Sequence, residues 1–402
     1  MNNFSANNKA ICDAPHAMLP LTDILFLNFF PSTRSLPMSI KAGLVGLPNV
    51  GISTLFNALT NSQVPAENYP FCTIEPHNAI TEVPDPRLDQ LAAVYGSKKF
   101  IPATVSFVDI AGLVKGASKG EGLGNQFLGH IRECGLILHV LRCFESNDGP
   151  VDPLDHFDTI ISELGLKDLD SIEKRLAKMQ SLFKAAQNKP AEKKALEKEQ
   201  ELLEGISKAL NTQDIDKVRK LIETADVETV PLITSRKFLI IANLSEQDFV
   251  EDAYKNNAAY QTLVKTFGQE RVIPICAKTE FELTKLDDAE CTELMEMLGI
   301  KARGLATIIA RAYTELDLIT FFTVGPKEAH AWPLRKGRTV RQAAGEIHSD
   351  LERGFICADI CNYKDLVQYK SEAGVREAGK MRTEGQGYLV QDGDWLHIKF
   401  NV

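Results

Sequence analysis

The amino-acid sequence predicts an α/β protein. A doubly wound parallel sheet carries an inserted antiparallel helical hairpin and is followed by a smaller module of strands around a helix. Three observations predict this class. Short apolar runs, typical of buried parallel strands, recur before residue 142 and again after residue 237. The stretch between them has helical spacing and no strand-like run, and alternation of apolar and polar residues returns from Leu318.

The first predicted strand, Ala42–Val45, leads into residues 46–54, which read GLPNVGIST. The related pattern G-x-x-x-x-G-K-[ST] binds phosphate. Its backbone N–H groups curl around the phosphates, its lysine reaches the β and γ oxygens, and its hydroxyl ligates Mg²⁺. Here Ile52 takes the lysine position. The run Thr54–Thr60 predicts a helix whose N-terminus would favour an anion. An ordinary glycine-bearing turn is the alternative. The candidate phosphate-binding residues are Asn49, Val50, Gly51, Ile52, Ser53 and Thr54.

Three further predicted strands end in motifs of nucleotide hydrolases. Strand Val105–Asp109 continues to Gly112 as D-x-x-G, in which the aspartate holds Mg²⁺ through water and the glycine N–H meets the γ-phosphate. Strand Phe238–Asn243 resembles the start of the guanine-binding N-K-x-D motif, with Glu246 at the aspartate position. A fourth strand, Arg271–Lys278, would bring a small-residue loop against the base. Motifs in this order at strand ends match ligand binding at the switch point of a doubly wound sheet.

The segment from about Asp155 to Ala225 predicts a helical hairpin. Apolar residues at alternating spacings of three and four indicate a heptad seam, formed by Leu169, Ile172, Leu176, Met179, Phe183 and Ala186. The sequence Asn188-Lys189-Pro190 interrupts this seam. A compatible pattern then resumes on a second helix at Leu196, Leu203, Ile206 and Leu210.

The last predicted module begins at Leu318. Its strands are Ile319–Val324 and Leu396–Phe400, and a helix is expected near Thr339–Leu351. About eighty residues in this arrangement resemble a TGS domain, a small β-grasp module found in proteins of translation and stringent control.

Taken together, the motifs resemble the YchF-type ATPases, relatives of the Obg P-loop proteins, over roughly Ser39–Val402. The resemblance rests on GLVGLPNVG at 43–51, PFCTIEP at 70–76, DIAGLVKGASKGEGLGNQ at 109–126, the N-x-x-E motif at 243–246 and VQDGD at 390–394. It implies a P-loop nucleotide-binding domain at 38–154 and 230–317, a coiled-coil hairpin at 155–229 and a TGS domain at 318–402. It also implies an ATPase that favours ATP over GTP and binds the ribosome, in particular the large subunit.

The resemblance also implies roles for single residues. Ser53 and Thr73 would ligate Mg²⁺, and Asp109 would hold its water shell. Gly112 would meet the γ-phosphate. On the base side, Asn243 would brace the P-loop, Leu244 would contact adenine through its backbone, and Glu246, one methylene longer than aspartate, would misplace the bidentate pair that guanine requires. Asn49 lies where related proteins coordinate a potassium ion. The alternative for it is a loop asparagine bonded to its own backbone.

Departures from the family pattern bear on hydrolysis. Loss of the lysine contact to phosphate at Ile52 costs about 2–3 kcal/mol, which slows a reaction roughly a hundredfold. The connection at 144–152 is shortened and lacks a histidine that family members carry there. Nearby His156 falls in a helical run and is expected on the helix surface. Leu113 stands where ordinary GTPases have glutamine, and no general base can be assigned. The alternative function is therefore a ribosome-binding module that does not hydrolyse its nucleotide.

Composition limits the partners. A net charge of −9 over 402 residues argues against broad nucleic-acid binding, and no DNA partner is expected. Lysines near the hairpin tip either form a solvated face or contact ribosomal RNA phosphates. They are Lys174, Lys178, Lys184, Lys189, Lys193, Lys194 and Lys198. Eight cysteines without a C-x-x-C pair indicate reduced thiols and a cytoplasmic location.

The N-terminal region carries the one segment of the sequence that could suggest a membrane or export signal. Met18–Phe30 is too short to span a bilayer and lacks a basic flank, so no membrane association is expected. Residues 1–37 are predicted to be a disordered extension or the product of a misassigned start before Met38. A targeting peptide is the alternative.

Overall fold

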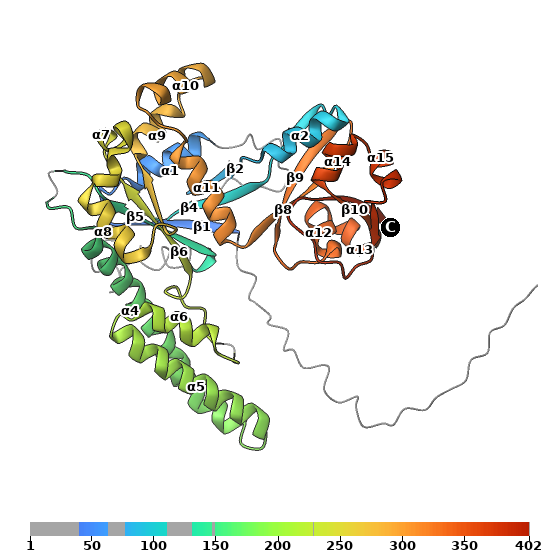
Figure 1. Ribbon diagram of the computed structural model, residues 1–402. Coiled ribbons are helices and arrows are strands. Elements are labelled where there is room, and N and C mark those ends of the chain that lie inside the picture. Colours follow the sequence, from blue (N-terminus) through green and yellow to red (C-terminus); the bar gives the residue numbers. More distant parts are fainter. Residues whose placement is uncertain (1–39, 63–76, 111–130, 147–148, 228, 402) are drawn as a thin grey trace, which may run out of the picture. The chain divides into compact units, whose positions relative to one another are not determined.

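The computed structural model describes residues 40–62, 77–110, 131–146, 149–227 and 229–401. Figure 1 shows their arrangement. Outside the hairpin and the C-terminal module, the elements in chain order are β1 (Lys41–Val45), α1 (Ile52–Asn61), β2 (Asn78–Glu82), α2 (Pro86–Tyr95), β3 (Lys99–Ile101), β4 (Thr104–Asp109), β5 (Leu136–Arg142), β6 (Lys237–Asn243), α7 (Glu246–Phe249), the 3₁₀ helix η3 (Val250–Asn256), α8 (Ala258–Phe267), β7 (Val272–Ile275), α9 (Ala277–Leu283), α10 (Asp288–Met297) and α11 (Gly304–Glu315).

The first sheet has the strand order β2-β4-β1-β5-β6-β7. Its pairs are parallel except for β2, which runs antiparallel to β4 at the edge. The register sets Leu44 beside Asp109 and Arg142 beside Asn243. The carboxyl ends of β1, β4, β5 and β6 therefore meet at one edge of the sheet. This confirms the predicted doubly wound class, with one antiparallel edge strand added.

Both faces of this sheet are buried, which explains why its strands read as continuous apolar runs. One face packs against α1 and α11 in a cluster that includes Leu44, Leu55 and Ile308. The opposite face packs against α8 and the first half of helix α4 (Pro153–Ala185) in a cluster that includes Ile137 and Phe157.

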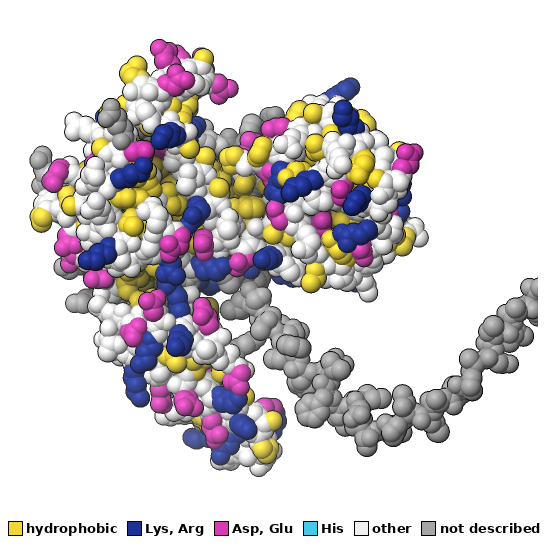
Figure 2. Space-filling view, viewed as in Figure 1, with side chains coloured by type: hydrophobic (Ala, Val, Ile, Leu, Met, Phe, Trp, Pro, Cys, Tyr) yellow, Lys and Arg dark blue, Asp and Glu magenta, His cyan; other side chains and the backbone are white. Residues whose placement is uncertain are grey.

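Helices α4, α5 (Pro190–Asn211) and α6 (Ile215–Glu223) follow β5. The predicted seam is confirmed, because Ile172, Met179, Leu203 and Ile206 are buried in a separate apolar cluster. Pro190 is the first residue of α5, where its missing N–H costs no hydrogen bond. Basic and acidic side chains are interspersed along the exposed surface of this hairpin (Figure 2).

A buried carboxylate fastens the hairpin to the segment that returns to the sheet. Asp168 of α4 is 0% exposed. One of its oxygens accepts a hydrogen bond from the backbone of Ile233 (2.9 Å), and the other accepts from the backbone (2.8 Å) and hydroxyl (2.7 Å) of Thr234. Three donors thus converge on one carboxylate just before β6 begins.

The C-terminal module consists of β8 (Leu318–Val324), β9 (Glu328–Arg335), α12 (Val340–Ile347), α13 (Ser349–Arg353), β10 (Phe355–Asn362), α14 (Tyr363–Tyr369), α15 (Glu372–Glu377), β11 (Arg382–Glu384) and β12 (Asp394–Phe400). Its sheet has the order β11-β10-β12-β8-β9-β3, with β12 and β8 parallel at the centre. This is the β-grasp arrangement. Residues of α12 and the inner strands share one apolar cluster.

Two local expectations need correction, and one strand was not expected. The helix predicted near Thr339–Leu351 is two helices, because the backbone of His348 is extended, with φ −165°. The strand predicted over Arg271–Lys278 stops at Ile275, and Lys278 lies in α9. Strand β3 was not anticipated. It comes from the segment between β2 and β4, yet it pairs in parallel with β9 of the C-terminal sheet.

Among the described residues, none of the helices has the length and apolarity needed to cross a membrane.

Candidate functional site

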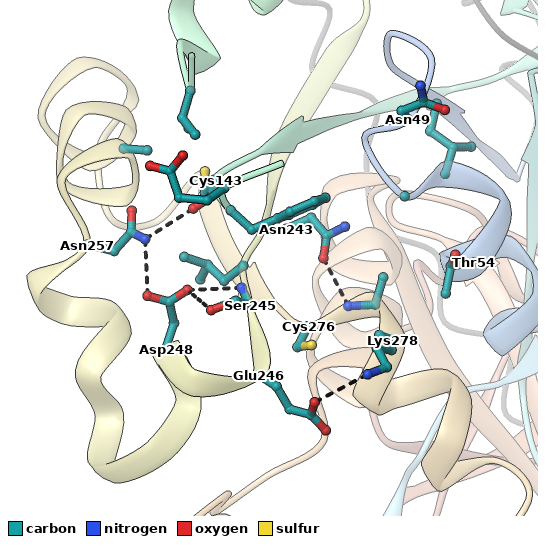
Figure 3. Close-up of a pocket in the computed structure, with 18 of the residues that line it drawn as sticks. Asn49, Thr54, Cys143, Asn243, Ser245, Glu246, Asp248, Asn257, Cys276 and Lys278 are labelled. Atoms are coloured by element: carbon teal, nitrogen blue, oxygen red, sulfur yellow. Dashed lines mark hydrogen bonds and ion pairs between the residues drawn. The ribbon is translucent and has the colours of Figure 1, made fainter. Parts of the chain in front are cut away.

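A cavity of about 1570 Å³ lies where the carboxyl ends of the parallel strands meet. The loops after β1, β5, β6 and β7 and the N-terminus of α8 line it, and Asp109 at the end of β4 contributes to the wall. Figure 3 shows this site, with Asn49 and Glu246 at opposite ends of the drawn pocket. The topology thus brings together segments that are far apart in the sequence.

The loop after β1 turns sharply into α1. Gly51 caps the helix with φ 98°, and a Cβ atom built there would lie 2.2 Å from Nδ2 of Asn243. Only glycine fits this position. Asn49 is also left-handed, with φ 62°, and its side chain is exposed. Ser53 and Thr54 line the cavity at the first turn of α1. Backbone N–H groups at such a turn favour an anion.

Ile52 packs into the protein core at the base of the loop. The residue is 8% exposed and belongs to the same apolar cluster as Val50 and Leu55. Its Cδ1 lies 2.9 Å from the point where a Cβ would stand on Gly46. The isoleucine therefore packs under the phosphate loop. A lysine could not leave its ammonium group there and would have to extend toward the cavity.

Asn243 joins two loops of the site. It is 4% exposed, donates from Nδ2 to the carbonyl of Val50 (2.8 Å) and accepts at Oδ1 from the N–H of Ala277 (3.0 Å). The expected brace to the P-loop is present. The second bond also occupies the N-terminus of α9, which explains why the predicted strand ends before Lys278.

The neighbours of Asn243 form the far end of the cavity. Leu244 is 2% exposed, and its N–H donates to the carbonyl of Ile275 (2.7 Å), so this N–H is already used. The Glu246 carboxylate lies 3.5 Å from the Lys278 ammonium. Their side chains are 41% and 69% exposed, so water screens this pair and it holds little energy. The Glu246 side chain can therefore change position easily.

Asp109 is placed for a cationic partner. Its N–H donates to the carbonyl of His77 (2.9 Å), which fixes the end of β4. Its Oδ1 is buried and has no hydrogen-bond partner in the described part of the chain. Burial raises the pKa of this carboxyl, and the charge of His77 only partly opposes the effect. A buried carboxylate oxygen of this kind, at a cavity that Ser53 also lines, fits a hydrated Mg²⁺ ion.

Two predicted site residues, Thr73 and Gly112, lie outside the described residues.

Sequence reasoning missed Arg142, which anchors the shortened connection after β5. Arg142 is 3% exposed and donates to the carbonyls of Gly149 (3.1 Å) and Pro150 (3.0 Å) and to the Ser146 hydroxyl. The only signal in the sequence was a single arginine at the end of an apolar run. His156 is half-buried rather than on the open helix surface. Burial lowers its pKa, and the charge of Arg142 adds to this effect.

A second missed group links the loops after β5 and β6 on the wall of the cavity. Ser245 and Asn257 both donate to the carboxylate of Asp248, and Asn257 also donates to the carbonyl of Cys143 (Figure 3). All four residues line the cavity.

Comparisons with known proteins agree with this geometry. A family model described as "50S ribosome-binding GTPase" matches residues 41–190. The model named YchF-GTPase_C, described as "Protein of unknown function (DUF933)", matches residues 318–401. The chain is 44% identical to the "Ribosome-binding ATPase YchF" of Haemophilus influenzae and 43% identical to that of Bacillus subtilis, each over 91% of this chain and 100% of the relative. The solved YchF GTPase of Schizosaccharomyces pombe is similar with a TM-score of 0.75 and 35% identity, over 89% of this chain and 97% of that one.

Proposed function

The chain belongs to the YchF family of P-loop proteins, and we propose that it binds Mg²⁺-ATP in preference to GTP and hydrolyses it slowly to ADP and phosphate. We further propose that it does so in association with the large subunit of cytoplasmic ribosomes. The curated relatives carry the name ribosome-binding ATPase. Nucleotide binding is supported above all by one observation: the P-loop, Asp109 and the Asn243–Glu246 segment all line one cavity.

In this proposal the triphosphate lies along Asn49–Thr54. Backbone N–H groups at the start of α1 would bind its oxygens, and Gly112 would meet the γ-phosphate. Ser53 and Thr73 would ligate Mg²⁺, and the unpartnered oxygen of Asp109 would hold a water of its shell. Mg²⁺ supplies charge neutralisation at the β and γ oxygens. No residue of the chain is assigned as general base.

The preference for adenine over guanine is inferred from the backbone of Leu244, whose N–H is already hydrogen-bonded. The N–H of Leu244 is bonded to Ile275, so a backbone contact from Leu244 to the base would use its carbonyl oxygen. Adenine presents an amino donor at its sixth position, whereas guanine presents an acceptor oxygen there. A carbonyl at this point therefore favours adenine. Glu246, paired with Lys278 at the cavity mouth, leaves guanine without its fitted carboxylate.

A potassium ion is proposed to assist hydrolysis at Asn49. The exposed, left-handed Asn49 lines the phosphate end of the cavity. Within the described residues, its side chain forms no hydrogen bond to its own backbone, so its amide oxygen is available. A cation there would add positive charge near the phosphates, in a site that lacks the P-loop lysine.

Ribosome contacts are proposed at the tip of the hairpin. Lys174, Lys189, Lys193 and Lys198 form ion pairs with neighbouring carboxylates on the hairpin surface. Exposed pairs of this kind are weak and can exchange for RNA phosphates. Lys178, Lys184 and Lys194 form no ion pair within the described part of the chain, so phosphates would meet no competing partner at these positions.

A second candidate function is favoured by the burial of Ile52. Because this side chain packs under the loop, the cradle is stabilised without a ligand and lacks the cation that reaches the γ-phosphate. The chain would then be a ribosome-binding protein whose nucleotide site binds ATP weakly and does not hydrolyse it.

Phosphate release from Mg²⁺-ATP and Mg²⁺-GTP, with potassium or sodium, distinguishes the two functions. We expect slow, potassium-stimulated release from ATP by the natural chain and a roughly hundredfold increase in Ile52→Lys. Ile52→Met is the matched control. Methionine is similar in length to lysine but has no charge, so this variant should show no increase in phosphate release. Release that stays at background in both the natural chain and Ile52→Lys would support the non-hydrolysing module.

A further inference from the structure

We infer that Asn257 and Asp248 are positioning residues that fix the base end of the cavity and thereby maintain the preference for adenine. This inference rests on the proposed function. It concerns the side chains that hold the base-binding segment, and neither residue needs to touch the nucleotide.

Asn257 uses its whole amide group to join three segments of the chain. Its Nδ2 donates both to the carbonyl of Cys143, after β5, and to Oδ1 of Asp248, after β6, each at 3.1 Å. Its Oδ1 accepts from the N–H of Tyr260 (3.1 Å) and so caps helix α8. Positions 114 residues apart in the sequence are thus linked through one side chain.

Asp248 fixes the segment that we assign to the base. Its Oδ2 accepts from the N–H (3.0 Å) and the hydroxyl (2.5 Å) of Ser245. This capping box sets the start of α7 and holds Ser245 between Leu244 and Glu246. With one carboxylate oxygen bonded to Ser245 and the other to Asn257, Asp248 connects the base-binding segment to Asn257 and, through Asn257, to the carbonyl of Cys143 after β5.

The two walls are also linked where β5 and β6 end. There the N–H of Cys143 donates to the carbonyl of Asn243 (2.8 Å). Farther along, the bond from Asn257 to the carbonyl of Cys143 joins the segments after β5 and β6 a second time, and the bond from Asn257 to Asp248 ties this contact to Ser245 (Figure 3). Both Asn257 hydrogen bonds are partly buried, and the one to Asp248 ends on a carboxylate, so they contribute more than exposed bonds.

Replacement of Asn257 by aspartate removes the hydrogen bonds that Asn257 donates and keeps the one that it accepts. Aspartate has the same shape and still accepts the Tyr260 N–H, so the cap of α8 is retained. Both donations are lost, and a second carboxylate faces Asp248. The two walls should then separate at the base end, while the phosphate loop, held by Asn243, keeps its geometry.

The test is equilibrium binding to the full chain, in both the natural sequence and Ile52→Lys. The ligands are Mg²⁺-ATP, Mg²⁺-GTP and Mg²⁺-tripolyphosphate. For Asn257→Asp we expect about tenfold weaker ATP binding and an ATP-to-GTP affinity ratio that moves toward one. Tripolyphosphate affinity should not change, because that ligand has no base. Asn362→Asp, the same change at the N-cap of α14 in the C-terminal module, is the matched control and should leave all three affinities unchanged.

A reciprocal exchange provides the rescue. In Asp248→Asn with Asn257→Asp, an amide at 248 can donate to the carboxylate at 257, while the bond to the Cys143 carbonyl stays lost. We expect part of the ATP preference to return. An unchanged ATP-to-GTP ratio in Asn257→Asp, or equal losses for ATP and tripolyphosphate, would overturn the inference. Absence of ATP binding in both backgrounds before any change at 257 would overturn the proposed function, and with it this inference.

Discussion

At the residue scale, the site depends on side chains whose partners are remote in the sequence. Ile52 and Glu246 were visible as departures from motifs, because each stands at a fixed offset from glycine or asparagine. The inward packing of Ile52 could not be read from the motif, since it depends on the space beneath Gly46. Arg142 and Asp248 were missed because they bind groups of their own connecting loops at spacings that no motif fixes. Asn257 was missed because one of its acceptors, the Cys143 carbonyl, lies 114 residues earlier in the chain.

His139 provides a prediction at this scale. This histidine of β5 is 2% exposed and lies edge-on to Phe157 (4.9 Å between ring centroids) and Phe238 (5.7 Å). Burial, with a smaller effect from Arg219, lowers its pKa to about 3. The unfolded chain binds a proton near pH 6.5 whereas the folded chain does not, so stability is lost as the pH falls from about 6.5 toward 3.

The corresponding variant is His139→Leu. Its free energy of unfolding should fall less steeply between pH 6.5 and pH 5 than that of the natural chain, by up to about 1.4 kcal/mol per pH unit. Urea unfolding at a series of pH values measures this slope. Equal slopes for His139→Leu and the natural chain would show that His139 does not contribute.

At the element scale, long periodic segments were predictable and short ones were not. The heptad seam and the continuous apolar strands carry strong periodic signals, and both are confirmed. Strand β3 has only three residues and forms because β9 offers an unpaired edge, so its own sequence carries no signal. The break between α12 and α13 at His348 depends on a helix cap. The side chain of His348 accepts a hydrogen bond from the N–H of Asp350 and so starts α13.

Asp168 gives the prediction for the hairpin. The substitution Asp168→Asn would turn an amide NH₂ group toward donors that now bind a carboxylate. We expect a loss of about 1–3 kcal/mol in the free energy of unfolding, with faster amide exchange at residues 229–236. Asp170→Asn is the matched control on the same helix, because its pair with Lys174 is exposed and should contribute less than about 1 kcal/mol. Similar losses for both variants would contradict an anchoring function for Asp168.

At the scale of the whole molecule, residues 86–101 connect the nucleotide-binding sheet to the C-terminal module. Arg87 of α2 donates to Asp392 (2.6 Å), Ser97 donates to the carbonyl of Gly325 (2.8 Å), and β3 completes the C-terminal sheet. This segment lies between β2 and β4, and β4 ends at Asp109. The predicted module boundaries did not reveal this contact, because they place residues 86–101 wholly within the nucleotide-binding domain, whereas β3 pairs with β9 of the C-terminal module.

We propose that this cavity is an adenine nucleotide site that remains usable although isoleucine replaces the P-loop lysine. Titration calorimetry of the full, unaltered chain with Mg²⁺-ATP and then with Mg²⁺-GTP tests it most directly. We predict saturable binding of one ATP per chain with micromolar affinity, and weaker binding of GTP. No detectable binding of ATP, or GTP bound as tightly as ATP, would contradict the claim.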